Sequence, residues 1–244
     1  VKEGGDAAVF SYTSQFDGAS LTSETVEVTE EEIREAYEKV DETLLSVMRK
    51  AIVNIRTYHE KQVAESWFTS EENGVILGQK VTPIDTVGVY APGGKAFYPS
   101  SALMNIVPAK VAGVRHILMC TPPDKEGRID PARLVAAKEA GADRIFKVGG
   151  AQAIAALAYG TQTIGKVDKI VGPGNAFVAE AKKQVFGAVS IDMIAGPSEI
   201  LIVADGKGDP RHTAADLLSQ AEHDKLASAV LVTDSMPFAE AVRA

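Results

Sequence analysis

The sequence has a single cysteine, Cys120, among its 244 residues, and it has neither a cluster of basic residues nor a long apolar run. One cysteine excludes an internal disulfide and a zinc site built from several thiolates. The formal net charge of −8 argues against binding to the phosphate backbone of a nucleic acid. No apolar run approaches the roughly 18 residues that span a bilayer, and the N-terminus lacks a signal-peptide pattern. These absences predict a cytoplasmic protein that binds neither nucleic acid nor membrane.

Both ends of the sequence look cut. The first residue is Val1 and not methionine, and residues 236–244 stop within a helix-like pattern. We expect the chain to be a truncated form of a longer protein.

The remaining composition is that of a soluble globular protein, with 45% hydrophobic and 24% charged residues. From Gly74 onward, short apolar segments alternate with helical patterns, which predicts a parallel sheet covered by helices on both faces. The expected strands are 85–90, 116–120, 144–148, 169–171, 189–192, 200–203 and 229–233. The expected helices are 100–112, 131–140, 151–159, 176–185 and about 210–225.

The N-terminal part is predicted to be helical. A short helix is expected over residues 7–16. Thr29 and Glu32 have the spacing of a capping box, and apolar residues then recur every three or four positions. This pattern predicts one long helix over about 29–65. The aromatic residues Tyr58, near the end of this helix, and Trp67 and Phe68, just beyond it, are expected to be packing residues.

Four of the predicted strands end in glycine followed by a polar residue. These loops are APGGK at 91–95, GGAQA at 149–153, GPGN at 172–175 and AGPSE at 195–199. Glycine lets a ligand approach the main chain, and a following helix offers free N–H groups to an anion. Because ligands bind at the carboxyl ends of parallel strands, this edge is predicted to be a binding face. A G-x-G-x-x-G fingerprint and a Walker lysine motif are absent from the sequence.

Gln220 and His223 lie three positions apart on a predicted helix, so their side chains share a face. An amide oxygen and an imidazole nitrogen can both bind zinc. Two ligands do not complete a zinc site, and such a pair at a helix end is commonly solvated or capping.

Five spaced motifs together resemble the histidinol dehydrogenase family. They are VGVYAPGGKAFYPSS at 87–101, GGAQAIAALAYGT at 149–161, VGPGN at 171–175, DMIAGPSE at 192–199 and SQAEHD at 219–224. The similarity extends over essentially the whole chain and includes FDG at 16–18.

The resemblance implies an oxidoreductase of histidine biosynthesis, an NAD-dependent and zinc-assisted enzyme. The family oxidises L-histidinol to L-histidine in two steps, through an enzyme-held aldehyde. By resemblance, Tyr90, Gln152 and Asn175 would contact NAD, and Ser198, Gln220 and His223 would contact the substrate. Gln220 and His223 would also be zinc ligands.

The resemblance also implies a fold and an assembly. The family has a pair of incomplete Rossmann-like domains related to those of aldehyde dehydrogenases. Residues 1–88 and 200–244 would form the first, unfinished domain, and residues 89–199 would form the second, nucleotide-binding domain. The family is homodimeric. Its Glu-His acid/base pair and its remaining zinc ligands lie further toward the C-terminus and match no residue here, so this chain is expected to be inactive alone.

Two other hypotheses for the function of this chain stay open. The chain could be a non-catalytic nucleotide-binding module of the same fold. It could also be a thiol-dependent aldehyde oxidoreductase that uses Cys120.

Overall fold

The computed structural model describes residues 1–93, 98–194, 198–222 and 227–244. These residues form two compact units, Val1–Ile194 and Ala195–Ala244.

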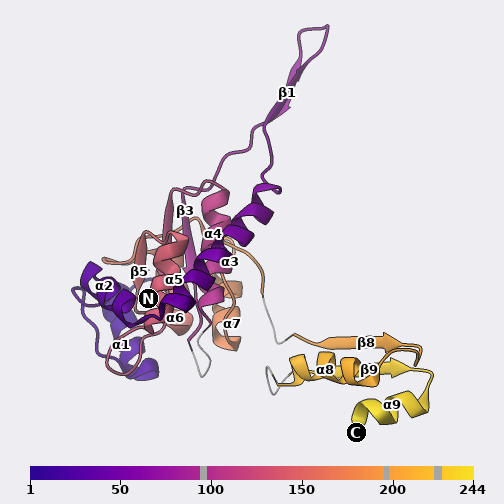
Figure 1. Ribbon diagram of the computed structural model, residues 1–244. Helices are drawn as coiled ribbons and strands as arrows, with labels where there is room; N and C mark the ends of the chain where they lie inside the picture. Colours follow the sequence, from indigo (N-terminus) through magenta and orange to yellow (C-terminus); the bar gives the residue numbers. More distant parts are fainter. Residues whose placement is uncertain (94–97, 195–197, 223–226) are drawn as a thin grey trace. The chain divides into compact units, whose positions relative to one another are not determined.

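The first unit is built on a five-stranded parallel sheet with the strand order β5-β4-β3-β6-β7 (Figure 1). β3, the first of these strands in the sequence, lies in the middle. The chain continues to one side through β4 and β5, and then passes to the other side for β6 and β7. This order places a topological switch point between β3 and β6, where ligand crevices form in such sheets. The strands are β3 (Thr86–Tyr90), β4 (His116–Cys120), β5 (Arg144–Phe146), β6 (Lys169–Val171) and β7 (Ser190–Ile191).

Helices cover both faces of this sheet, so the predicted α/β fold is confirmed. One layer contains α2 (Glu30–Lys39), α3 (Glu42–Glu60), α4 (Pro99–Val111) and α5 (Pro131–Ala140). The other layer contains α1 (Gly5–Asp17), α6 (Gly150–Tyr159) and α7 (Ala176–Val185).

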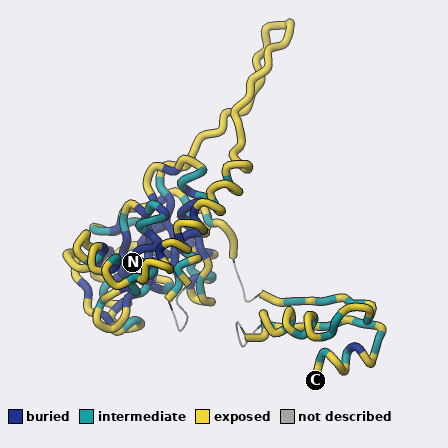
Figure 2. The backbone as a smooth tube through the Cα atoms, viewed as in Figure 1, coloured by how far each residue is buried: buried dark blue, intermediate teal, exposed yellow. Residues whose placement is uncertain are grey.

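Two hydrophobic cores lie on the two sides of the sheet, because successive strand residues point to opposite faces. Val87 and Val89 of β3 pack in the core beneath α4 and α5. The next residue, Tyr90, packs in the core beneath α6, together with Cys120 and Phe146. Burial of both faces explains why these strands read as nearly continuous apolar runs. Figure 2 shows this buried interior.

The prediction of one long helix over 29–65 is wrong, because the structure has two helices there, separated at Val40 and Asp41. Val40 has an extended backbone, with ψ of 129°. The Asp41 carboxylate accepts hydrogen bonds from the N–H groups of Thr43 and Leu44 at 2.8 and 3.2 Å, and so starts a new helix. The apolar periodicity continues across the break because both helices bury residues in the same core. Among the described residues, no helix is both long enough and apolar enough to cross a bilayer.

Strands β1 (Trp67–Ser70) and β2 (Ile76–Gln79) form an antiparallel hairpin that was not predicted. Every residue of the two strands is exposed (Figure 2). The predicted packing of Trp67 and Phe68 is therefore wrong, since they are 54% and 68% exposed, and the same prediction is wrong for Tyr58 of α3, which is 66% exposed. The signal was present in the sequence as Asn73-Gly74 between two short β-prone segments, which is a hairpin signature.

The second unit contains the parallel strands β8 (Ile200–Ala204) and β9 (Ala229–Thr233) with α8 (Pro210–Ala221) and α9 (Met236–Arg243). Phe238 is the one buried hydrophobic residue among those described in this unit. The proposed pairing of residues 1–88 with 200–244 in one domain, and of 89–199 in another, stays a prediction.

Candidate functional site

A pocket of about 1070 Å³ lies at the carboxyl ends of β3, β4, β5 and β6. Tyr90, Gln152 and Asn175, the three residues predicted to contact NAD, all line it. They come from the end of one strand, the first turn of one helix and the start of another. The switch point of the sheet brings together these residues, which are far apart in the sequence.

Tyr90 is the last residue of β3, and its side chain is buried in the core beneath α6. Its hydroxyl oxygen accepts a hydrogen bond from the N–H of Gly150 at 3.0 Å. Burial raises the pKa of the Tyr90 hydroxyl to about 12, so the group stays protonated at neutral pH. A protonated hydroxyl that already accepts one bond retains a proton to donate to a ligand.

Gln152 lies in the first turn of α6 and is only 5% exposed. Its side-chain nitrogen donates to the carboxylate of Asp17 at 3.3 Å. Asp17 is the last residue of α1 and also lines the pocket. Burial raises the pKa of the Asp17 carboxyl above its usual value. The contact between these side chains holds the Gln152 amide at the pocket wall.

Asn175 is the N-cap of α7, and its side-chain oxygen accepts a hydrogen bond from the N–H of Val178 at 3.1 Å. The amide oxygen thus serves as the helix cap. The amide nitrogen is the donor group of this side chain, and it can donate to a ligand.

Three helices begin at the pocket: α5 near Pro131, α6 at Gly150 and α7 after Asn175. Helix N-termini carry partial positive charge and N–H groups that lack intrahelical partners. The N-cap residue of α6, Gly149, has no side chain to cap the helix, and the N–H of Gly150 donates to the Tyr90 hydroxyl. This arrangement suits an anionic ligand such as a diphosphate.

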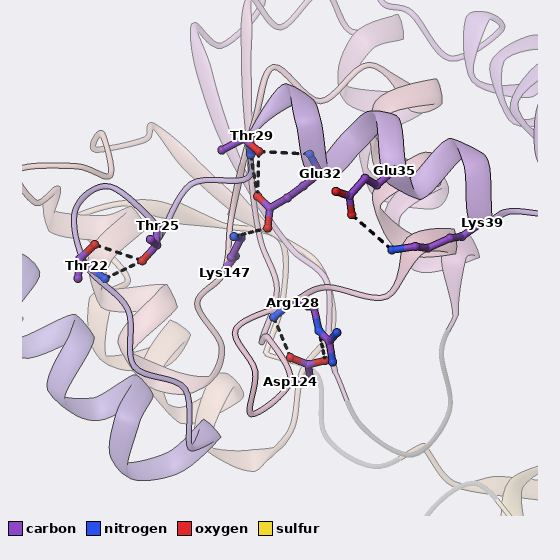
Figure 3. A network of polar contacts seen from close by, with 9 residues as sticks. All are labelled: Thr22, Thr25, Thr29, Glu32, Glu35, Lys39, Asp124, Arg128 and Lys147. Atoms are coloured by element: carbon purple, nitrogen blue, oxygen red, sulfur yellow. Dashed lines mark hydrogen bonds and ion pairs between the residues drawn. The ribbon is translucent and has the colours of Figure 1, made fainter.

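The end of β5 is anchored to the first helical layer near the pocket (Figure 3). Lys147, 5% exposed, donates to the Glu32 carboxylate, and Glu32 also closes the capping box with Thr29. The predicted capping box is confirmed. Because Lys147 directly precedes Val148 and Gly149, this contact holds the loop that leads to Gln152.

Charged residues of both signs line part of the pocket. Arg128 is paired with Asp124 at 3.4 Å, and Lys39 donates to Glu35, also at 3.4 Å (Figure 3). Lys39, Asp124 and Arg128 were not among the site residues predicted from the sequence. The signal for Asp124 was the run Pro122-Pro123-Asp124, which follows a strand at the same edge of the sheet.

Two of the other predicted site residues, Ser198 and Gln220, do not line this pocket. Ser198 is exposed and lies just before β8 in the second unit, and Gln220 is partly buried at the end of α8. His223 lies outside the described residues. Within residues 1–93, 98–194, 198–222 and 227–244, no three His, Cys, Asp or Glu side chains gather as a metal site would require. The roles of Ser198, Gln220 and His223 stay predictions.

Cys120 is fully buried at the end of β4, and burial raises the pKa of its thiol to about 12. A raised thiol pKa favours the unreactive protonated form, and burial keeps a reagent away from the sulfur. We expect the native chain not to react with a thiol reagent such as Ellman's reagent at pH 8, and the chain in 8 M urea to release one equivalent. Rapid reaction of the native chain would contradict this expectation and would support the hypothesis of a thiol-dependent aldehyde oxidoreductase.

The comparisons with known proteins by sequence cover the whole chain. The family model described as histidinol dehydrogenase matches residues 1–244. The chain is 60% identical over 244 residues to "Histidinol dehydrogenase" of Bacillus subtilis, covering 57% of that protein. It is 60% identical over 235 residues to the protein of that name from Clostridium acetobutylicum, covering 54% of it. The chain thus spans little more than half the length of these relatives.

Solved structures give the same result. The crystal structure of histidinol dehydrogenase from Elizabethkingia anophelis matches with a TM-score of 0.90 and 41% identity, over 97% of this chain and 55% of that one. A proposed aldehyde dehydrogenase from Anabaena variabilis matches with a TM-score of 0.51 and 12% identity, over 81% of this chain and 42% of that one. The second likeness concerns the fold alone, and it agrees with the predicted aldehyde-dehydrogenase-like fold class. A family model that matches every residue, together with relatives at 60% identity, places this chain in the histidinol dehydrogenase family.

Proposed function

We propose that this chain provides the NAD-binding part of an enzyme that oxidises L-histidinol to L-histidine in two NAD-dependent steps. The observation that carries the proposal is that Tyr90, Gln152 and Asn175 line the same pocket, in a chain of this family.

The residues of the pocket fit a dinucleotide. The volume of the pocket, about 1070 Å³, lies just above the roughly 300–1,000 Å³ of small-molecule sites. The α6 N-terminus supplies N–H groups for a diphosphate. The Tyr90 hydroxyl and the Asn175 amide nitrogen supply donors for ribose or amide oxygens.

Zinc and substrate are assigned to the second unit. Gln220 and His223 would hold zinc, which would fix the imidazole and the amino group of histidinol, and Ser198 would contact the substrate. An amide oxygen and an imidazole nitrogen are acceptable zinc donors, but they are only two of the four that zinc usually takes. The complete site would therefore need residues beyond this pair.

Hydride loss from an alcohol also needs a positioned base. The family's Glu-His pair has no counterpart in this sequence, so the chain alone is proposed to bind NAD without turning over. The working enzyme is proposed to be a cytoplasmic homodimer.

Calorimetric titration with NAD tests the role of the pocket. Tyr90→Phe and Gln152→Ala each remove a donor from the pocket, and we expect each to raise the Kd for NAD about tenfold, the equivalent of one hydrogen bond. Tyr58→Phe and Gln184→Ala make the same chemical changes on exposed helix positions, and should leave the Kd unchanged. If all four variants bound NAD with the Kd of the unsubstituted chain, the assignment of NAD to this pocket would be refuted.

Turnover is tested by complementation. The chain is assayed for NAD reduction with L-histidinol and zinc, alone and after mixing with the remaining C-terminal part of the Bacillus subtilis relative. Activity only in the mixture supports the proposal. NAD binding without activity in either sample would favour the non-catalytic nucleotide-binding module.

A further inference from the structure

Lys182 on α7 is a buried lysine that does not line the pocket. Its side chain is 3% exposed; the ammonium group donates to the Asp192 carboxylate and, at 3.0 Å, to the carbonyl oxygen of Gly172. A buried ion pair is weak evidence of added stability, because apolar residues of similar volume often stabilise as well. What this pair adds is a set of directional hydrogen bonds.

Those hydrogen bonds bind both main-chain polar groups of Gly172, its N–H and its carbonyl oxygen. The second carboxylate oxygen of Asp192 accepts the N–H of Gly172 at 2.8 Å, while Lys182 donates to the Gly172 carbonyl. Gly172, Asp192 and Lys182 therefore form a closed ring of contacts. This ring fixes the orientation of the chain directly after β6.

Gly172 is also the residue by which this loop contacts β3. Its φ is +110°, and a Cβ atom built on it would lie 2.1 Å from the carbonyl oxygen of Tyr90. The loop thus packs on the backbone of one residue of the pocket. Three positions later, Asn175 begins α7 and lines the same pocket. The position of Gly172 consequently sets the position of Asn175 relative to Tyr90.

Lys182 lies seven residues after Asn175, which is two turns of α7 and the same face of the helix. Its contact with Gly172 ties the middle of α7 back to the loop in front of the helix. We propose that Lys182 and Asp192 are positioning residues of the nucleotide site, which hold Gly172 so that Asn175 faces the ligand. This inference rests on the proposed NAD function of the pocket.

The test is a double-mutant cycle on NAD affinity. Lys182→Met removes the charge and the hydrogen bond to Gly172 while keeping an extended apolar side chain. We expect it to raise the Kd for NAD about tenfold. In a chain that already carries Asn175→Ser, which retains an oxygen able to cap α7, Lys182→Met should change the Kd less than twofold. A general loss of folding would weaken binding in both backgrounds, and would overturn the inference.

Arg49→Met is the control for the loss of an ion pair away from the pocket. Arg49 forms a two-bond ion pair with Glu139, at 2.8 and 2.9 Å, and it does not line the pocket. This pair joins α3 to α5 and is more exposed than the pair of Lys182, since the Arg49 side chain is 54% exposed. We expect the Kd for NAD to stay within twofold of the unsubstituted chain.

A measurement without ligand separates the ring of contacts from the binding function. The Gly172 amide should exchange slowly with deuterium in the unsubstituted chain, and at least tenfold faster in Lys182→Met and in Asp192→Asn. Asp192→Asn is the milder variant, because that side chain is 29% exposed, and it serves if Lys182→Met does not fold. Unchanged exchange, or unchanged NAD affinity in a folded variant, would overturn the positioning role. Absence of NAD binding by the unsubstituted chain would instead overturn the proposed function, and the positioning role with it.

Discussion

Replacing Gly172 by alanine is expected to abolish measurable NAD binding and to lower the free energy of unfolding by about 3–5 kcal/mol. The new Cβ atom would lie 2.1 Å from the Tyr90 carbonyl oxygen, and this neighbour is backbone in the central strand, which cannot move aside cheaply. The residue also has a φ of +110°, which is unfavourable for any side chain. Urea unfolding followed by circular dichroism and calorimetric NAD titration measure the two effects.

Gly187→Ala is the control that separates the clash from the backbone strain. Gly187 has a similar φ of +99°, but no atom lies within 4 Å of a Cβ atom built there. We expect this variant to lose only about 1 kcal/mol and to bind NAD normally. If both variants lost the same stability, the close approach of Gly172 to Tyr90 would not be the cause.

Replacing Phe146 by alanine is expected to lower the free energy of unfolding by about 3–5 kcal/mol. Phe146 is fully buried at the end of β5, where its ring packs in the core beneath α6 and under the Arg144 guanidinium. Truncation removes apolar contacts and leaves a cavity in a region that relaxes poorly. Because a domain is stable by only about 5–15 kcal/mol, such a loss is a large fraction of the total.

The control for this truncation is Phe186→Ala, the same change on a side chain that is 67% exposed. We expect it to alter the free energy of unfolding by less than about 0.5 kcal/mol. A comparable loss in both variants would show that burial of Phe146 is not what stabilises the sheet.

The elements of the sheet were predictable because each carries a local signal. The last four residues of β4, 117–120, are apolar at consecutive positions, as expected for a strand buried on both faces. The capping box of Thr29 and Glu32 needs only residues three positions apart. The division at Asp41 was missed because apolar periodicity continued through it, although the aspartate that caps α3 was visible in the sequence.

The residues of the pocket were predictable only in part. Tyr90, Gln152 and Asn175 were selected by resemblance to a family, and the glycine-rich strand ends agreed with that choice. Asp17, Lys39 and Arg128 were not selected, because they come from a helix end, another helix and a surface loop without a shared pattern. Their proximity depends on how the two helical layers pack on the sheet.

The sequence by itself determined the alternation of strands and helices, the parallel sheet and the family, because these depend on local periodicity and on motifs that are contiguous in the chain. The tertiary structure alone decided that β3 lies between β4 and β6, which places Tyr90, Gln152 and Asn175 around one pocket. It also decided that Lys182 donates to the carbonyl oxygen of Gly172 and that Asp192 accepts a hydrogen bond from its N–H group. These arrangements are contacts between residues that are distant in the sequence. Local conformational preferences act over a few neighbouring residues and therefore do not determine such contacts.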